Sequence, residues 1–329
     1  MWIFDSHQDI ALSTLFTTNT DFFKSNKISD GWNNLGLPVN NQTDFPRLLQ
    51  SDTRATFAAV CTFSMKNGQI YPSKKPNIDT LEQINEYKKI IRDSKNKVFL
   101  IKNKKGLKLI KKGKLGLILH LEGADVLSQN PKHLEALFNS GVRSIGLTWN
   151  FANNLAGGAK SKQELTNLGR QIIKEMEEKG ILLDLSHLNL RSTIEVLKII
   201  KKPCIISHTN CLSLCNNLRN TSDEIMRKVS KRGGLIGISA VPSFIGKNPT
   251  IEKLCNHIIY AIKLCGVENV CLGTDFGAMT DNQLTYNFSD VSDIPRLYPN
   301  LLKMGLSEKH TQMFMHSNVV NLLKNILPN

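Results

Sequence analysis

Histidines and carboxylates recur where the short apolar runs of this 329-residue sequence end. The groups concerned are His7, Asp9, Glu122, His187, His208 and Asp275. Imidazole and carboxylate together are a typical ligand set for zinc or a similar divalent cation. Each position alone is explained as simply by a turn carboxylate or a hydrogen-bonded histidine. The whole set indicates a metal centre, because a purely structural explanation must account for polar ends on several apolar runs at once.

Eight apolar runs are predicted to be the strands that position these groups. The runs are 2–4, 55–62, 115–121, 144–148, 181–185, 204–206, 235–239 and 270–273. Most of them lack polar alternation, which is typical of strands buried on both faces. Helical patterns lie between them. Capping boxes at Ser161 and Thr221 predict two helix starts, and Gly180 predicts a helix end.

Eight strands that alternate with helices predict an α/β fold, a (β/α)8 TIM-like barrel. An open doubly wound sheet is the alternative. Polar groups at the ends of five different strands favour the barrel, whose active sites lie where the strands end. No linker or repeat divides the sequence, so we expect residues 1–329 to form a single domain. The long irregular stretch at about 17–54 is predicted to be a loop over the active site.

In order and spacing, these motifs resemble the membrane (renal) dipeptidase family of binuclear zinc peptidases, which have barrels of the amidohydrolase type. The chain is most similar to the family's bacterial-type soluble members. The matching motifs are Asp5-Ser6-His7-Gln8-Asp9, Leu121-Glu122-Gly123, Asp184-Leu185-Ser186-His187, Ser207-His208, Asn217-Leu218-Arg219-Asn220, Gly273-Thr274-Asp275-Phe276 and residues 317–323. Related barrels usually begin with His-x-His, so the His-x-Asp of this chain favours the dipeptidase family over its neighbours.

The resemblance implies a pair of Zn2+ ions as the cofactor. His7 and Asp9 are implied to bind one ion. His187 and His208 are implied to bind the second ion. Glu122 is implied to bridge both ions and to take part in catalysis. Two ions about 3.5–4 Å apart can share a hydroxide that attacks the scissile carbonyl at neutral pH.

Three further residues are implied to handle the substrate. Asp275 contacts it and carries the proton of the attacking water to the leaving amine, as a general base and then an acid. Arg219 binds the terminal carboxylate of the substrate through its guanidinium. Animal members of the family carry histidine where Trp149 stands, so we expect Asn150 to supply a substrate hydrogen bond instead. A tyrosine expected after the seventh strand is not evident within residues 238–242.

The sequence therefore predicts a zinc-dependent metallo-dipeptidase that hydrolyses free dipeptides, including those with a D-configured C-terminal residue. One alternative is a metal-dependent nuclease or another amidohydrolase on the same barrel. A second is a binding protein that keeps the fold without the chemistry. With neither a signal peptide nor a run of about 18 apolar residues, we expect a cytoplasmic enzyme without membrane or nucleic-acid partners. The sequence leaves open whether the chain forms a homodimer.

The basic charge of the chain is concentrated in one segment. Lys plus Arg number 42 and Asp plus Glu 28, which gives a net charge of +14. Residues 88–114 contain twelve Lys or Arg and one acidic residue, Asp93. Nearly all of the twelve are lysines without interleaved Trp or Tyr, which indicates a solvated face and not a nucleic-acid groove. We expect this segment on the outside of the barrel at its amino-terminal end, away from the metal ligands.

Overall fold

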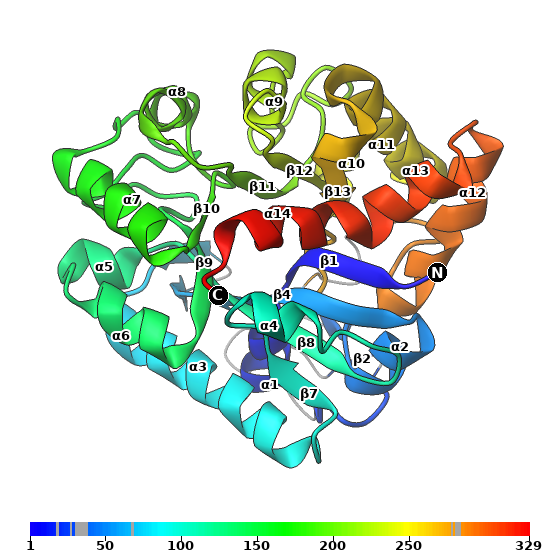
Figure 1. Ribbon diagram of the computed structural model, residues 1–329, viewed down its shortest axis with the longest axis horizontal. Helices are drawn as coiled ribbons and strands as arrows, with labels where there is room; N and C mark the ends of the chain where they lie inside the picture. The colour runs from blue at the N-terminus through cyan, green and yellow to red at the C-terminus, as the bar shows by residue number, and fades with distance from the viewer. Residues whose placement is uncertain (18–19, 27, 30–38, 67–68, 278, 280–283) are drawn as a thin grey trace.

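The chain folds into a nearly closed barrel of eight parallel strands with helices between them, as Figure 1 shows. This computed structural model describes residues 1–329 except 18–19, 27, 30–38, 67–68, 278 and 280–283. The strand order is β1-β4-β8-β9-β10-β11-β12-β13, so consecutive barrel strands are always neighbours. The predicted (β/α)8 barrel is confirmed, and the alternative of an open doubly wound sheet is wrong.

Each of the eight predicted runs corresponds to one barrel strand. The strands are β1 (Ile3–Gln8), β4 (Thr53–Cys61), β8 (Leu115–Glu122), β9 (Val142–Gly146), β10 (Leu182–Asp184), β11 (Ile205–Thr209), β12 (Leu235–Ile238) and β13 (Val270–Leu272). Strands β1 and β11 run further than the apolar runs predict. His7 and His208 therefore lie within strands.

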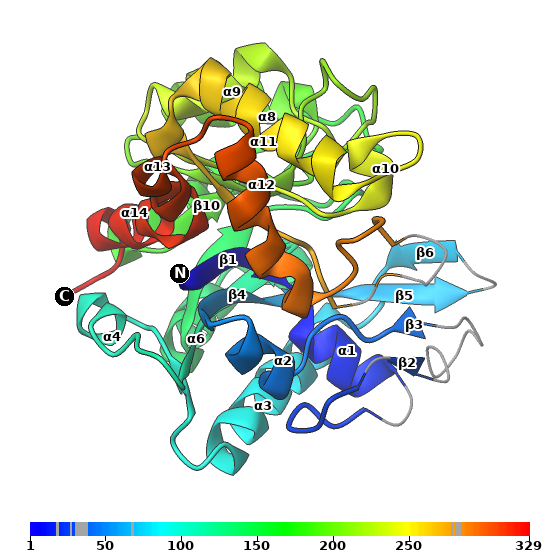
Figure 2. The same ribbon diagram turned by 90° about the vertical axis from the view of Figure 1, so that its right-hand side faces the viewer.

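Shorter strands lie outside the barrel order. Strand β7 (Val98–Leu100) pairs in parallel with the first three residues of β8. Two antiparallel pairs are formed by β2 (Ile28–Ser29) with β3 (Val39–Asn40), and by β5 (Phe63–Lys66) with β6 (Gln69–Pro72). In Figure 2, β5 and β6 project from the side of the barrel opposite to the chain termini.

The helices between the strands begin at side-chain caps that differ from the predicted ones. Thr166 caps α7 by accepting the Gly169 N–H, and Ser222 caps α9. The Ser161 hydroxyl instead accepts from the backbone of Gln163, so the capping boxes at Ser161 and Thr221 are wrong. Gly180 ends α7 in the left-handed conformation, as predicted.

The helices are α1 (Ile10–Phe16), α2 (Phe45–Gln50), α3 (Pro76–Asp93), α4 (Lys104–Leu107), α5 (Asp125–Gln129), α6 (His133–Ser140), α7 (Asn167–Lys179), α8 (Leu190–Ile199), α9 (Asp223–Ser230), α10 (Pro242–Ile245), α11 (Ile251–Cys265), α12 (Leu297–Lys303), α13 (Glu308–Gln312) and α14 (Asn318–Ile326).

Helix α14 covers the end of the barrel at which the strands begin (Figure 1). Its apolar residues Val319, Leu322 and Leu323 share a buried cluster with Phe4 of β1 and Ile118 of β8. Helix α14 therefore closes the barrel at the end where the strands begin. The barrel interior is accessible at the opposite end, where the strands finish.

The barrel closes where the first strand meets the chain that follows the last one. The Asp275 N–H donates to the His7 carbonyl over 3.0 Å, and the Asp9 N–H donates to the Phe276 carbonyl over 2.8 Å. The Ser6 hydroxyl adds a bond of 2.8 Å to the Leu272 carbonyl. Backbone hydrogen bonds therefore join the two ends of the sheet beside the predicted site residues.

The predicted active-site loop at about 17–54 lies partly outside the described residues. Its described part contains β2, β3 and α2. The Gln42 amide oxygen accepts the Gly277 N–H over 3.2 Å and the Met279 N–H over 2.9 Å, and the Thr43 hydroxyl donates to Gln8. Residues 41–43 are therefore tied to the carboxyl end of β1 and to the segment after β13.

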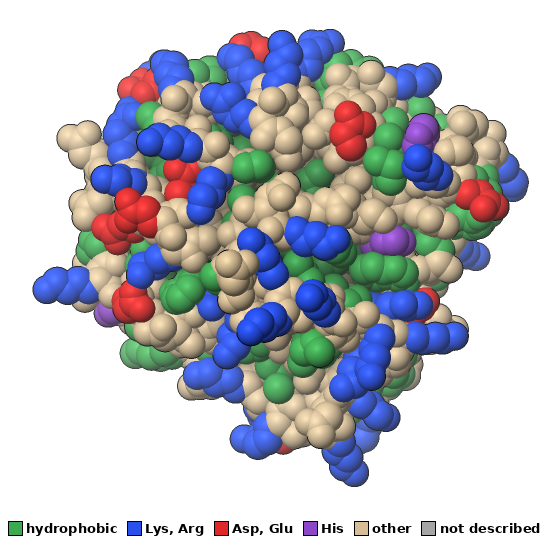
Figure 3. Space-filling view, viewed as in Figure 1, with side chains coloured by type: hydrophobic (Ala, Val, Ile, Leu, Met, Phe, Trp, Pro, Cys, Tyr) green, Lys and Arg blue, Asp and Glu red, His purple; other side chains and the backbone are tan. Residues whose placement is uncertain are grey.

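The lysine-rich segment 88–114 comprises the end of α3, strand β7 and helix α4. The Lys104 N–H donates to the Pro328 carbonyl, which places α4 beside the end of α14. Figure 3 shows numerous Lys and Arg side chains on the face that α14 covers. The basic segment therefore lies at the amino-terminal end of the barrel.

Within the described parts of the chain, no helix combines the length and the apolar character needed to cross a membrane.

Candidate active site

Six predicted site residues meet at the carboxyl ends of five barrel strands. His7 lies in β1, Asp9 directly follows β1, and Glu122 is the last residue of β8. His187 follows β10, His208 lies in β11 and Asp275 follows β13. All but Asp275 are almost fully buried. The barrel thus gathers imidazole and carboxylate groups that are widely separated along the chain.

The Glu122 carboxylate lies at the centre of this group. Its Oε1 is 2.8 Å from His187 Nε2, 3.4 Å from His208 Nε2 and 3.6 Å from His7 Nε2. His7 Nε2 is also 3.5 Å from Asp275 Oδ1 and 4.0 Å from Asp9 Oδ1. Two ligand triads follow from these positions, His7 with Glu122 and His208, and His7 with Asp9 and Asp275. His7 is therefore common to the two triads.

Burial shifts the pKa of every member of the site toward its neutral form. Burial and the nearby Asp275 charge raise the pKa of Glu122 to about 8. Burial, followed by the charges of Glu122 and Asp275, raises the pKa of Asp9 well above its usual range. Burial lowers the pKa of His7 and of His187 well below that of a free histidine. The histidines are therefore neutral, which is the form that binds metals.

Two site residues have backbone conformations that side-chain-bearing residues rarely adopt. His187 has φ 66° and Asp275 has φ 67°, both in the left-handed region. Such strain persists where the surrounding structure enforces it and is concentrated at functional sites. For Asp275, the hydrogen bond from its N–H to the His7 carbonyl holds the turn.

Arg219 reaches the site from the loop between β11 and α9. Its Nη2 donates to His208 Nε2 over 2.9 Å, and its guanidinium carbon lies 5.4 Å from the centre of the Phe244 ring. Burial raises the pKa of Asp275 to about 6, although the positive charge of Arg219 acts to lower it. Arg219 is thus a cation at the border between the histidine cluster and the space outside it.

Asn150 and Trp149 both lie next to the His187 ring. The Asn150 Oδ1 is 2.9 Å from His187 Nδ1, a contact that orients the imidazole. The Trp149 ring lies 5.6 Å from the His187 ring and 6.0 Å from Phe63, against which it stacks. The structure therefore places Asn150 against a candidate metal ligand, and Trp149 in an aromatic wall beside it.

Asp184 was not among the predicted site residues, yet it connects the two strands that carry His187 and His208. It accepts the backbone N–H groups of Ser186 and Ser207, both over 2.9 Å, and the Ser207 hydroxyl over 2.5 Å. Its Oδ2 also lies 3.2 Å from His120 Nε2. Burial alone would raise the pKa of Asp184, but His120 and these hydrogen bonds hold it well below the usual range. Its place in the Asp184-Leu185-Ser186-His187 motif was the available sequence signal.

Cys61 is a second residue that the sequence did not single out. It ends β4 opposite Glu122 in the strand register, and its thiol forms a hydrogen bond with the Glu122 carboxylate. The Gln83 side chain holds the Cys61 backbone at both its N–H and its carbonyl. Burial and the nearby carboxylates raise the pKa of the Cys61 thiol well above its usual value, so it remains protonated.

The residues present fit a divalent metal site. The buried His7 Nε2 and Asp9 Oδ1 have no hydrogen-bond partner among the described residues, although both face the other carboxylates and histidines. Buried polar atoms are otherwise paired almost without exception, so unpartnered ones at a cluster of ligand groups call for an ion. The mixture of imidazole nitrogen and carboxylate oxygen suits zinc and similar cations.

Comparison with known proteins finds dipeptidases among the similar sequences. The chain is 25% identical over 294 residues to the dipeptidase tcpJ of Claviceps purpurea, an alignment that covers 86% of this chain and 69% of that protein. It is 30% identical over 224 residues to the dipeptidase verJ of Clonostachys rogersoniana, covering 66% of this chain and 57% of that protein.

Solved structures of similar fold include two bacterial proteins. One is a metallopeptidase from Rhodobacter sphaeroides, liganded with a phosphinate mimic of the dipeptide L-Ala-D-Ala, with a TM-score of 0.84, 19% identity and 99% of both chains covered. The other is the probable dipeptidase PvdM from Pseudomonas aeruginosa, with a TM-score of 0.85, 17% identity and coverage of 99% of this chain and 95% of that one.

The family model for membrane dipeptidases, peptidase family M19, matches residues 1–327 of the sequence. This match includes β1 and the segment after β13, whose hydrogen bonds close the barrel, and every site residue described above. The chain therefore belongs to the membrane dipeptidase family of metallopeptidases.

Proposed function

We propose that this protein is a binuclear zinc dipeptidase that cleaves free dipeptides. His7 and Asp9 would hold one ion and His187 and His208 the other, with Glu122 between them. The observation that carries the proposal is the convergence of these five ligand groups, including two buried atoms that lack a partner among the described residues. When bound, the two ions would supply an activated water and polarise the scissile carbonyl.

Asp275 is the group best placed to move protons. Its Oδ1 is 3.5 Å from His7 Nε2, at the border of the ligand cluster, and its side chain is more exposed than that of Glu122. A pKa raised to about 6 keeps Asp275 ionised at neutral pH and still able to take up a proton. Asp275 would accept a proton from the attacking water and pass it to the nitrogen of the departing amino acid.

Arg219 would bind the terminal carboxylate of the dipeptide. Its guanidinium is available to an anion, because its polar side-chain contact within the described part of the chain is with the neutral His208. A bidentate arginine–carboxylate pair both binds and orients a substrate. This contact would restrict the enzyme to short substrates with a free C-terminus. Asn150, which contacts His187, would hold that ligand and not the substrate.

The likeness to a structure bound to an L-Ala-D-Ala mimic supports including D-configured C-terminal residues among the substrates of this chain. The nuclease alternative has less support, because the lysine-rich segment lies at the end of the barrel away from the ligand cluster.

Purified protein should contain about two zinc ions per chain and hydrolyse Ala-Gly or Ala-D-Ala. Protein that binds no divalent metal, or that is inactive on both dipeptides after zinc loading, would contradict the proposal.

A further inference from the structure

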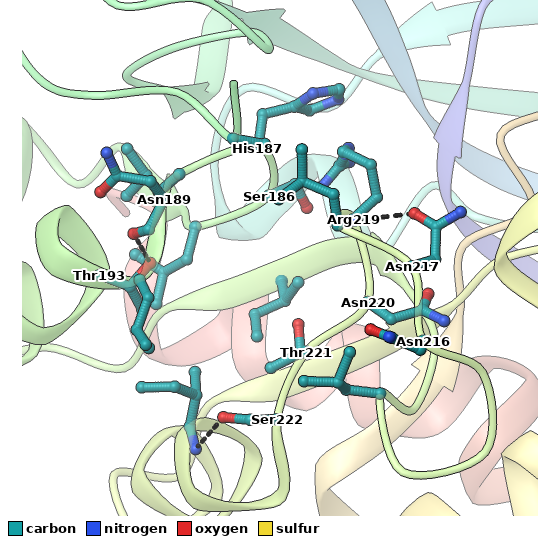
Figure 4. A pocket seen from close by; sticks show the side chains of 18 residues that line it. Ser186, His187, Asn189, Thr193, Asn216, Asn217, Arg219, Asn220, Thr221 and Ser222 are labelled. Carbon is teal, nitrogen blue, oxygen red and sulfur yellow. Dashed lines mark hydrogen bonds between the residues drawn. The ribbon is translucent and has the colours of Figure 1, made fainter. Parts of the chain in front are cut away.

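A pocket of about 330 Å3 adjoins the candidate active site on the side of Arg219 and His187. Figure 4 shows it between the loop that carries Arg219 and the first turns of α8 and α9. Its deep end is formed by the buried side chains of Leu185, Ile206 and Ile225. The pocket therefore runs from the border of the ligand cluster into the space between the strands and the helices that cover them.

Most polar side chains along this pocket are already engaged within the protein. Asn189 caps α8 through its Oδ1 and donates its Nδ2 to the Ser161 and Gln163 carbonyls. Ser222 caps α9, and the Thr193 hydroxyl donates to the Asn189 carbonyl. These bonds leave little polar capacity for a ligand, so the surface on offer is predominantly apolar.

Two leucines at the mouth of the pocket are exposed to solvent. Their exposure does not stabilise the folded protein. Leu190 is 58% exposed and Leu218, next to Arg219 in the chain, is 67% exposed. Of the residues that line the pocket, only Arg219 and His187 are ionisable, and both lie at the end that meets the ligand cluster. The pocket thus combines one cation at its inner border with uncharged walls.

We infer that this pocket receives the side chain of the substrate's C-terminal residue, and that it favours aliphatic and aromatic side chains. The inference rests on the proposed dipeptidase function. With the carboxylate on Arg219 and the scissile carbonyl at the ligand cluster, the Cα of that residue lies between the two. Its configuration then decides whether the side chain points into the pocket or away from it. The pocket is therefore also the element that distinguishes D- from L-residues when the side chain is large.

The test compares zinc-loaded protein on Ala-Gly with Ala-Leu in both configurations of the second residue. We expect kcat/KM for one configuration of Ala-Leu to exceed that for Ala-Gly by about tenfold or more, since hydrophobic pockets discriminate on this scale. The other configuration should gain nothing. Equal kcat/KM for Ala-Gly and both forms of Ala-Leu, or an equal gain in both forms, would overturn the inference.

Variants at the pocket localise the effect. Leu218→Ser removes apolar cover at the mouth, and Thr193→Met fills the interior. Each should lower the ratio of kcat/KM for the favoured Ala-Leu to that for Ala-Gly by about threefold or more. The control Leu109→Ser changes a leucine that is 56% exposed in the lysine-rich segment, and should leave the ratio unchanged. Unchanged ratios in both pocket variants would overturn the assignment to this pocket.

A binding measurement separates the pocket from the chemistry. Calorimetry with phosphinate mimics of Ala-Gly and of each Ala-Leu form should show the same preference in affinity, and Leu218→Ser should reduce it. If no dipeptide is hydrolysed and no metal is bound, the proposed function itself fails. If Ala-Gly is hydrolysed but side-chain size has no effect, only the pocket inference fails.

Discussion

His7 Nε2 lies 3.5 Å from Asp275 Oδ1, although the two residues come from the first and the last strands of the barrel. Their backbones are joined as well, because the Asp275 N–H donates to the His7 carbonyl over 3.0 Å. The seam that closes the barrel and the candidate active site are therefore the same place. A change at either residue acts on both, so the experiments below measure folding and metal content alongside activity.

The variant Asp275→Asn should lower kcat by about 10²–10⁴-fold, the usual contribution of a general acid–base group. The side chain keeps its size but can no longer accept the proton. Metal content, measured by elemental analysis, should stay near that of the native protein. The control Asp93→Asn, at the exposed end of α3, should keep full activity. A variant that loses its metal would show that Asp275 acts as a ligand instead.

Replacing Arg219 with methionine should lower kcat/KM for a free dipeptide by about 30-fold or more, the cost of losing one partner of a buried charged pair. Wild type and variant should differ far less on a dipeptide whose carboxylate is capped as an amide. Arg170→Met provides a matched control, because Arg170 pairs with Glu195 on the surface over 2.7 Å. An equal loss on free and capped dipeptides would contradict the role in carboxylate binding.

The variant Asp184→Asn should weaken zinc binding by about 10–100-fold, the range seen when groups that orient metal ligands are changed. Asp184 holds the backbone of Ser186 and Ser207, next to His187 and His208, so its charge fixes both candidate ligands. Competition with a zinc chelator measures the affinity. Unfolding of the metal-free protein in urea gives the separate loss of stability, about 1–3 kcal/mol for a disturbed buried hydrogen bond. Unchanged zinc affinity at reduced stability would leave Asp184 with a structural role alone.

His316 should make the stability of the protein depend on pH. Burial, and then the positive charges of Arg54 and the N-terminus, lower the pKa of His316 to about 4, and its ring stacks on Trp2 at 4.1 Å. Because the folded pKa lies below the unfolded value of about 6.5, its stabilising effect is complete above pH 6.5 and is lost as the pH falls toward 4. Urea unfolding of metal-free protein should therefore show a steeper loss over this range than unfolding of His316→Gln. Parallel curves for the two proteins would contradict this assignment.

The barrel could be predicted from the sequence because its strands are apolar on both faces. The candidate ligands could be found because they are the polar exceptions at the strand ends. Strand β7 was missed because it is three residues long and lies among lysines. The hydrogen bond from Cys61 to Glu122 depends on the register of β4 against β8, which no local pattern contains. The cap at Thr166 was missed for a related reason, since Ser161 offers the same local signal but is used in a turn.

The seam also sets the order in which the protein can become active. His7 and Asp9 are made first, but Asp275 and the helix α14 that closes the barrel are made only after all the other barrel strands. A nascent chain cannot assemble the complete set of site residues until its last strand has docked against its first. If the protein binds two zinc ions as proposed, tight binding of both requires a closed barrel, and zinc content would then report how much of a preparation has folded.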